Sequence, residues 1–176
     1  MRADELKGRA VVALSTAEKI GHVDDVLFDA EFRQVLGFRV KKGGLLSQTE
    51  VLQRDSIEAI GTAAVTVPSP DVLNDQERFA SLAHASTLGQ VQGTKVVTEG
   101  GELLGTIAHL EIDADARTVT AYALASTMLE RVLRHAEALV QANEVIRLGE
   151  GGIMVVADAV GARLQAEHAA PPEPPR

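Results

Sequence analysis

The stretch IGHVDDVLFDA at residues 20–30 returns as LGTIAHLEIDA at residues 104–114, which is 84 positions later. The match extends to both sides of this stretch, and the further matching pairs are Gly8 and Gly93, Arg33 and Arg117, Val35 and Val119, Phe38 and Tyr122, Ile57 and Val145, and Gly61 and Gly149. The spacing rises to 88 at the last pair, so the second copy gains four residues between Leu124 and Leu139. A repeat at a nearly fixed period predicts a duplicated structural unit.

Each copy is predicted to hold five or six short strands. Partial alternation of apolar and polar residues indicates half-buried antiparallel strands, and the shared motif Asp-Ala-x-x-Arg-x-Val predicts a hairpin turn opened by Asp29 or Asp113. The expected strands are 10–14, 22–28, 36–41, 57–60 and 64–67, then 95–97, 106–112, 120–125, 145–148 and 153–156. Such strands suit a small closed barrel. The predicted fold class is therefore mainly β, with two small β-barrels in tandem and short helices between and within the repeats.

The expected domain order follows from the repeat and from the Pro-rich segments. Residues 1–70 form the first barrel, and residues 71–90 form a helical linker whose helix is expected at Asp71–Ala83. Residues 91–160 form the second barrel. Residues 161–176 are expected to be a flexible Pro-rich tail.

Composition limits the classes of function. The net charge of −8 at pH 7 and the aromatic content of 3% disfavour a nucleic-acid partner. The chain has no cysteine, which excludes disulfides and thiolate chemistry. No apolar run approaches the ~18 residues of a membrane helix, so we expect a cytoplasmic protein with no transmembrane segment, and peripheral membrane association stays open.

The sequence contains no recognisable catalytic motif, so we expect no catalytic residue, cofactor site or metal site. The five histidines do not occupy matching positions in the two copies. Asp113 and Asp115 open either a calcium loop or, as we favour, a capped turn. Asp24, Asp25 and Asp29 form a solvated strand face or a carboxylate pair. Two basic clusters are solubilising charge or contacts to RNA or anionic lipid, namely Arg39, Lys41 and Lys42, and Arg131, Arg134 and His135.

Three segments of the first copy carry a resemblance to a known family. They read KGRAV at residues 7–11, KIGHVDDVLFD at 19–29 and VLGFRVKKGG at 35–44, and residues 104–107, Asp113 and 119–122 repeat them more loosely. These segments resemble the PRC-barrel domain. The resemblance implies tandem PRC-like barrels and a role in scaffolding without an assigned catalytic residue. Members include the cytoplasmic part of the photosynthetic reaction-centre H subunit and the C-terminal half of a ribosome maturation factor.

The expected function is that of a non-enzymatic scaffold or adaptor that acts through protein–protein contacts. The alternatives are an H-subunit-like cap on electron- or proton-transfer machinery, a ribosome-assembly adaptor, and a barrel that binds a small ligand. The expected partner is an unidentified protein or a second copy of the chain. The candidate binding surface is an apolar helical stripe with a charged rim in the four-residue gain, made of Met128, Leu129, Val132, Leu133, Arg131 and Arg134.

Overall fold

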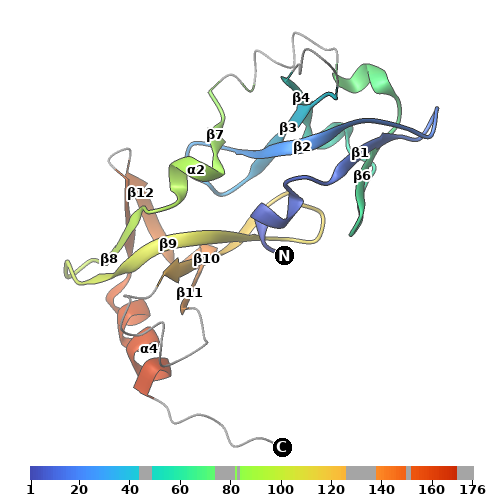
Figure 1. Cartoon of the computed structure of the whole chain (residues 1–176). Coiled ribbons are helices and arrows are strands. Elements are labelled where there is room, and N and C mark those ends of the chain that lie inside the picture. The colour runs from blue at the N-terminus through green and yellow to red at the C-terminus, as the bar shows by residue number, and fades with distance from the viewer. Residues whose placement is uncertain (44–48, 74–81, 83, 126–137, 150–151, 170–176) are drawn as a thin grey trace, which may run out of the picture.

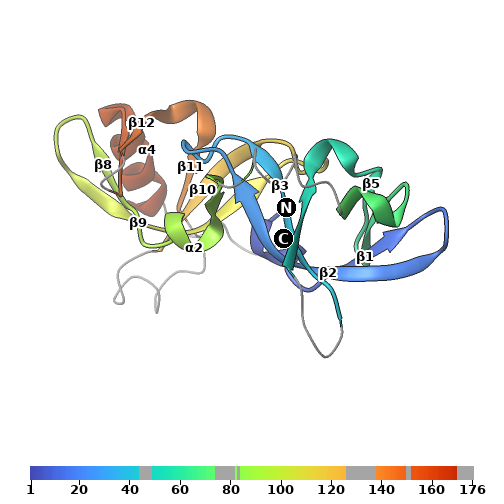
Figure 2. The ribbon, with the colours of Figure 1, turned by 90° about the horizontal axis from the view of Figure 1, so that it is seen from above.

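The structure is a computed structural model, and it describes residues 1–43, 49–73, 82, 84–125, 138–149 and 152–169. Two β-sheets lie side by side and the chain is elongated (Figures 1 and 2). The predicted fold class is confirmed, because each repeat forms its own sheet and the chain is mainly β. The predicted closure of each barrel is not seen among the described strands, because the two outermost strands of each sheet do not pair with one another.

The first repeat forms a sheet in the order β4-β3-β2-β1-β6-β5. Its strands are β1 (Ala10–Ala13), β2 (Glu18–Phe28), β3 (Val35–Lys41), β4 (Thr49–Gln53), β5 (Ala59–Ile60) and β6 (Ala64–Val67). β1 and β6 are parallel, and the other neighbours are antiparallel. β4 and β5 are thus the two edges of the sheet.

The second repeat forms the matching sheet in the order β11-β10-β9-β8-β13-β12. Its strands are β8 (Lys95–Thr98), β9 (Leu103–Ile112), β10 (Val119–Ala125), β11 (Ala138–Gln141), β12 (Val145–Gly149) and β13 (Ile153–Val156). β8 and β13 are again the parallel pair. A β-bulge interrupts β1–β2 pairing between Val11 and Val12, and another interrupts β8–β9 pairing between Val96 and Val97. The two sheets therefore share register as well as strand order.

The structure has strands that the sequence analysis did not predict. β4 and β11 complete the two sheets, and β2 and β9 begin several residues before their predicted starts. The strand predicted at 57–60 is observed only at residues 59–60, which form β5. The residues just before the predicted strand form the turn η2 (Arg54–Ser56). The corresponding turn in the second repeat is η4 (Ala142–Glu144).

Two short helices join the repeats to one another. η1 (Ala3–Leu6) and α2 (Leu88–Val91) occupy equivalent places, and each contacts both β2 and β9 (Figure 1). The residue or strand that precedes each helix pairs with the sheet of the other repeat. The backbone of Arg2 forms an antiparallel β-bridge with Glu111 of β9, and β7 (Ser86–Thr87) pairs with β2. Within the predicted helical linker at 71–90, residues 86–87 form β7, which pairs with β2 of the first sheet, and residues 88–90 belong to α2. The linker also contains η3 (Pro70–Leu73), and most of the predicted helix at Asp71–Ala83 lies outside the described residues.

The prediction of a flexible tail from residue 161 is wrong for residues 161–169. They belong to α4 (Asp158–Ala169), which buries Val160 and Leu164 against the core. The Asp158 carboxylate accepts a hydrogen bond from the Gly100 amide at 2.8 Å, which ties the start of the helix to the β8–β9 turn. Two apolar residues at i and i+4 define a buried helix face, and this signal precedes the Pro-rich residues. Residues 170–176 lie outside the described residues.

Glycine at two equivalent positions permits close packing of backbone. A Cβ on Gly21 would lie 2.7 Å from Val40 Cγ1 and 2.8 Å from the Lys41 carbonyl oxygen, and one on Gly105 would lie 3.0 Å from the Ala125 carbonyl oxygen. Gly105 also has a φ of 149°, which disfavours other residues. The repeat of this glycine in the sequence therefore reflects the backbone geometry of each sheet.

We expect Gly21→Ala to lower the free energy of unfolding by about 1–3 kcal/mol, because the new methyl group overlaps backbone that cannot move away. The matched control is Gly89→Ala in α2, where no atom lies within 4 Å of the added Cβ. Chemical denaturation of both variants measures the difference. Equal stability of the two variants would contradict the packing argument.

Candidate functional site

The predicted partner-binding stripe lies at residues 126–137, outside the described residues. Met128, Leu129, Arg131, Val132, Leu133 and Arg134 therefore stay a prediction, and so does the basic cluster that adds His135.

The aspartates at the two hairpin turns cap the backbone. Asp113 Oδ1 accepts a hydrogen bond from the Arg117 amide at 2.7 Å, and Oδ2 accepts from Thr118 Oγ1 at 2.6 Å. Asp29 Oδ1 accepts from the amides of Arg33 and Gln34 at 2.7 and 2.9 Å. Burial raises the pKa of Asp113, but the hydrogen bonds from Thr118 and Arg117 outweigh it and lower that pKa. The capped-turn interpretation of Asp113 is confirmed.

The other predicted charged groups pair with opposite charges. Asp24 lies 3.0 Å from Lys41 Nζ, and Asp25 lies 3.1 Å from Lys7 Nζ, so neither is paired with a carboxylate. Lys42 Nζ lies 2.6 Å from Glu50 Oε1. Two of the three cations in the cluster of Arg39, Lys41 and Lys42 are thus paired with neighbouring acids. The cluster lacks the excess positive charge of a nucleic-acid surface.

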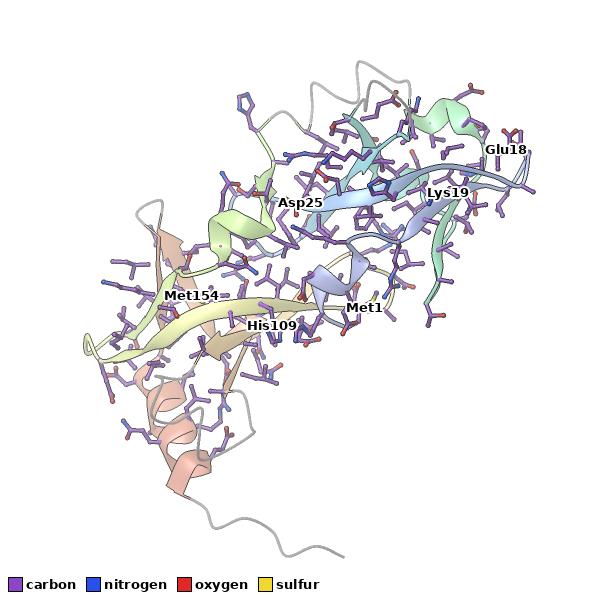
Figure 3. All side chains as sticks on the ribbon, viewed as in Figure 1. Met1, Glu18, Lys19, Asp25, His109 and Met154 are labelled. Atoms are coloured by element: carbon purple, nitrogen blue, oxygen red, sulfur yellow. The ribbon has the colours of Figure 1, made fainter. Side chains whose placement is uncertain are left out.

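The described residues contain no group of three His, Asp or Glu side chains placed to hold a metal ion. His109 is buried, with Nε2 3.6 Å from Glu111 Oε1, and it lies on β9 near Met1 (Figure 3). A surface hollow is lined by Lys19, Ile20, Gly21, His22, Lys42 and Gly43. Its lining includes two lysines and a histidine and is unlike that of an apolar ligand cavity. Among the described helices, none has the length and apolarity to cross a membrane.

The tips of the two hairpins meet in a short antiparallel bridge, which we call the seam. Gln34 lies opposite Thr118, the same position of the other repeat. The Val35 amide donates to the Arg117 carbonyl at 2.8 Å, and the Val119 amide donates to the Arg33 carbonyl at 2.9 Å. The two hydrogen bonds are equivalent under exchange of the repeats. The seam therefore lies on an approximate twofold axis that relates the two sheets.

Two buried polar side chains extend the seam, and each one holds the hairpin tip of the other repeat. Arg54 Nε, in the first repeat, donates to the carbonyls of Asp115 and Ala116 at 2.6 and 3.0 Å. The Tyr122 hydroxyl, in the second repeat, donates to the Phe32 carbonyl at 3.0 Å. Burial lowers the pKa of Arg54 and raises the pKa of Tyr122 to about 12. These polar groups serve the packing of one repeat on the other.

The repeats differ on the outer face of the sheets, which the sequence analysis did not single out. In the second repeat Leu103, Ile146 and Ile153 are 58%, 50% and 45% exposed. By strand register the equivalents of Leu103 and Ile153 in the first repeat are Lys19 and Ala64, and the sequence spacing of 88 makes Glu58 the equivalent of Ile146. The sequence spacings of 84 and 88 already align Leu103 with Lys19 and Ile146 with Glu58, whereas the pair Ile153 and Ala64, at a spacing of 89, is found only from the strand register.

The PRC-barrel domain model matches residues 1–73 and again residues 85–160. The chain belongs to the PRC-barrel domain family. Both matches agree with the repeat, and the second includes β7 and α2. The solved structure described as a putative 16S ribosomal RNA processing protein RimM from Pseudomonas aeruginosa is 18% identical to the chain, over 86% of this chain and 95% of that one. Its TM-score of 0.29 is too low to support an inference about function. No curated protein matches the chain.

Tyr122 is the only tyrosine of this PRC-barrel protein, so its phenolate absorbance reports the seam directly. We expect the folded protein to titrate near pH 12, and the unfolded chain in urea to titrate near the ordinary value of about 10. Since the folded pKa is raised, the stabilisation is complete below pH 10 and is lost as pH rises toward 12. A folded-state midpoint near 10 would contradict the burial of this hydroxyl.

Arg54→Met is expected to lower the free energy of unfolding by about 2–3 kcal/mol, because it leaves buried carbonyls of the other repeat without a donor. The control is Arg117→Met, which removes the exposed ion pair between Arg117 Nη1 and Asp55 Oδ1 (2.9 Å). That exposed pair contributes about 0.5 kcal/mol or less. Urea denaturation of the two variants tests the difference, and similar losses would exclude a special role for Arg54.

Proposed function

We propose that this PRC-barrel protein is a non-enzymatic, cytoplasmic scaffold or adaptor that acts by binding another protein. The observation that supports the proposal is the contrast between the two outer sheet faces. Matching side chains cap the turns of both repeats, whereas three of the four large apolar side chains that are exposed among the described residues, Leu103, Ile146 and Ile153, lie on the second repeat; the fourth is Leu14, which follows β1 of the first repeat. Exposed apolar side chains that the fold does not require are typical of contact surfaces.

An adaptor also needs a rigid body, and the seam supports one. Backbone hydrogen bonds, Arg54 and Tyr122 fix one sheet against the other, so surfaces on both repeats keep a set separation. A partner that contacts the second repeat is then held at a defined place relative to the first.

The alternative of a proton-relaying cap finds less support. A relay needs carboxyl groups with raised pKa values. The hydrogen bond from Arg2 lowers the pKa of Asp4, and the pKa of Asp113 is lowered as well.

Affinity capture of the tagged full-length chain from its native cell, with mass spectrometry of the bound proteins, tests the proposal. We expect one or a few proteins to be enriched over a tag-only control, and binding to persist in chelator because the described residues show no metal cluster. Ribosomal proteins among them would specify the ribosome-assembly alternative, and membrane electron-transfer proteins would specify the cap. Enrichment of nothing above the control would contradict the adaptor function.

A further inference from the structure

We propose that the outer sheet face of the second repeat docks a partner protein whose apolar surface is bordered by carboxylates. The inference rests on the proposed function and goes further by naming the site and the chemistry of its partner. The face, here called the β8–β13 face, is defined by Lys95, Val97, Leu103, Arg147, Ile153 and Val155.

Strand register brings these side chains into two adjacent rows. Val97 of β8 is the register partner of Leu103 in β9 and of Val155 in β13, and Val155 is the partner of Arg147 in β12. Lys95 is the partner of Ile153 in the next row. At about 4.8 Å between strands, the row from Leu103 to Arg147 spans about 14 Å. The inward-pointing neighbours Val96, Met154 and Val156 are fully buried, so the residues of the face point away from the core.

The first repeat shows that the fold does not need this apolar face. On the same backbone register Lys19 replaces Leu103, Thr66 replaces Val155, Ala64 replaces Ile153 and Ala59 replaces Arg147. The two faces lie at opposite ends of the molecule: Figure 3 places Lys19 at one end and Met154, the buried neighbour of Ile153, at the other. Val12 is the equivalent of Val97 and Ala10 the equivalent of Lys95, so the first-repeat face carries small side chains, one valine and one lysine. The duplication thus provides an internal control in which an equivalent sheet folds without the exposed Leu103 and Ile153 and without the cations Lys95 and Arg147.

Helix α4 does not cover the face. Gly161 of α4 lies against Thr98, whose side chain is buried, and against Leu104. Arg163 donates to the Leu139 carbonyl of β11 at 3.0 Å. These contacts place α4 on the inner side and leave Leu103 and Ile153 exposed.

The charges on the face favour an acidic partner. Lys95 and Arg147 border the apolar side chains, and neither forms an ion pair with another described residue. By contrast, Lys41 and Lys42 of the first repeat each pair with an acid. Two unpaired cations beside an apolar strip are complementary to a surface that pairs apolar side chains with carboxylates.

Other occupants fit the charges less well. An anionic membrane is bound by clusters of about 4–8 Lys and Arg, whereas this face carries Lys95 and Arg147 alone. A second copy that docks face to face would bring Lys95 and Arg147 close to the same cations of its partner. Nucleic acid meets the same obstacle as a membrane.

The test places a photo-crosslinking residue, p-benzoylphenylalanine, at Leu103 of the full chain in its native cell. The matched control carries it at Lys19, the equivalent position of the first repeat. We expect a crosslinked protein at position 103 and at least about tenfold less at position 19, which is the loss in occupancy that about 1.4 kcal/mol produces. The crosslinked segment of the partner should contain Asp or Glu. Should the Leu103 variant fail to fold by thermal melting, Ile153 takes its place, because it is also exposed.

Charge reversal then tests the border. Lys95→Glu with Arg147→Glu should reduce crosslinking from position 103 about tenfold or more, whereas Lys19→Glu should leave it unchanged. The inference is overturned if crosslinking is equal at positions 103 and 19. It is also overturned if the Lys95→Glu with Arg147→Glu variant crosslinks from position 103 as well as the unaltered charges do. A crosslink to a second copy overturns it too, and so does charge-dependent binding to phosphatidylserine vesicles with no protein crosslink.

The two proposals fail in different ways. A partner captured by the tagged chain but crosslinked elsewhere overturns the β8–β13 face and leaves the adaptor function standing. Capture of no specific protein overturns both.

Discussion

The antiparallel bridge between the two hairpin tips is the interaction on which the rest of the molecule depends. Each tip carries an aspartate-capped turn, so each presents the same backbone amide and carbonyl groups to the other. Two identical surfaces that meet across a twofold axis satisfy one another's hydrogen bonds. The exchange of Arg2 and β7 between the sheets repeats this reciprocity at η1 and α2. The duplicated chain therefore behaves as a dimer whose two subunits are covalently joined.

Joining the subunits allows the two sides of the seam to differ. Tyr122 donates to the tip of the first repeat, but its counterpart Phe38 is fully buried and has no hydroxyl. Arg54 donates to the tip of the second repeat, whereas its counterpart in η4 is Ala142. In a homodimer of identical subunits, a tyrosine or arginine at these positions would be present on both sides of the seam or on neither. In the duplicated chain Tyr122 and Arg54 each occur on one side, and each buried donor has a carbonyl acceptor in the other repeat.

The sequence predicts the sheets well and the contacts between them poorly. The repeat and the alternation of apolar residues identify most strands, because these are local signals. β4 and β11 were not predicted because their burial does not alternate cleanly between apolar and polar positions. The pairing of Arg2 with Glu111 joins residues over a hundred positions apart, so no local pattern reports it. The β8–β13 face escapes for a related reason: its rows depend on bulges, and a register shift of one residue moves a side chain to the other face.

Comparison of the two repeats separates what the fold requires from what it permits. Gly21 and Gly105 recur because a Cβ would meet backbone at both sites, and Asp29 and Asp113 recur because both turns need a cap. Lys19 and Leu103 share a register position on equivalent sheets, and both leave the packing of the strands intact. The fold therefore exerts no preference between charge and apolar surface at that position. An exposed leucine there adds little to stability, which leaves the position free for the contact proposed for the β8–β13 face.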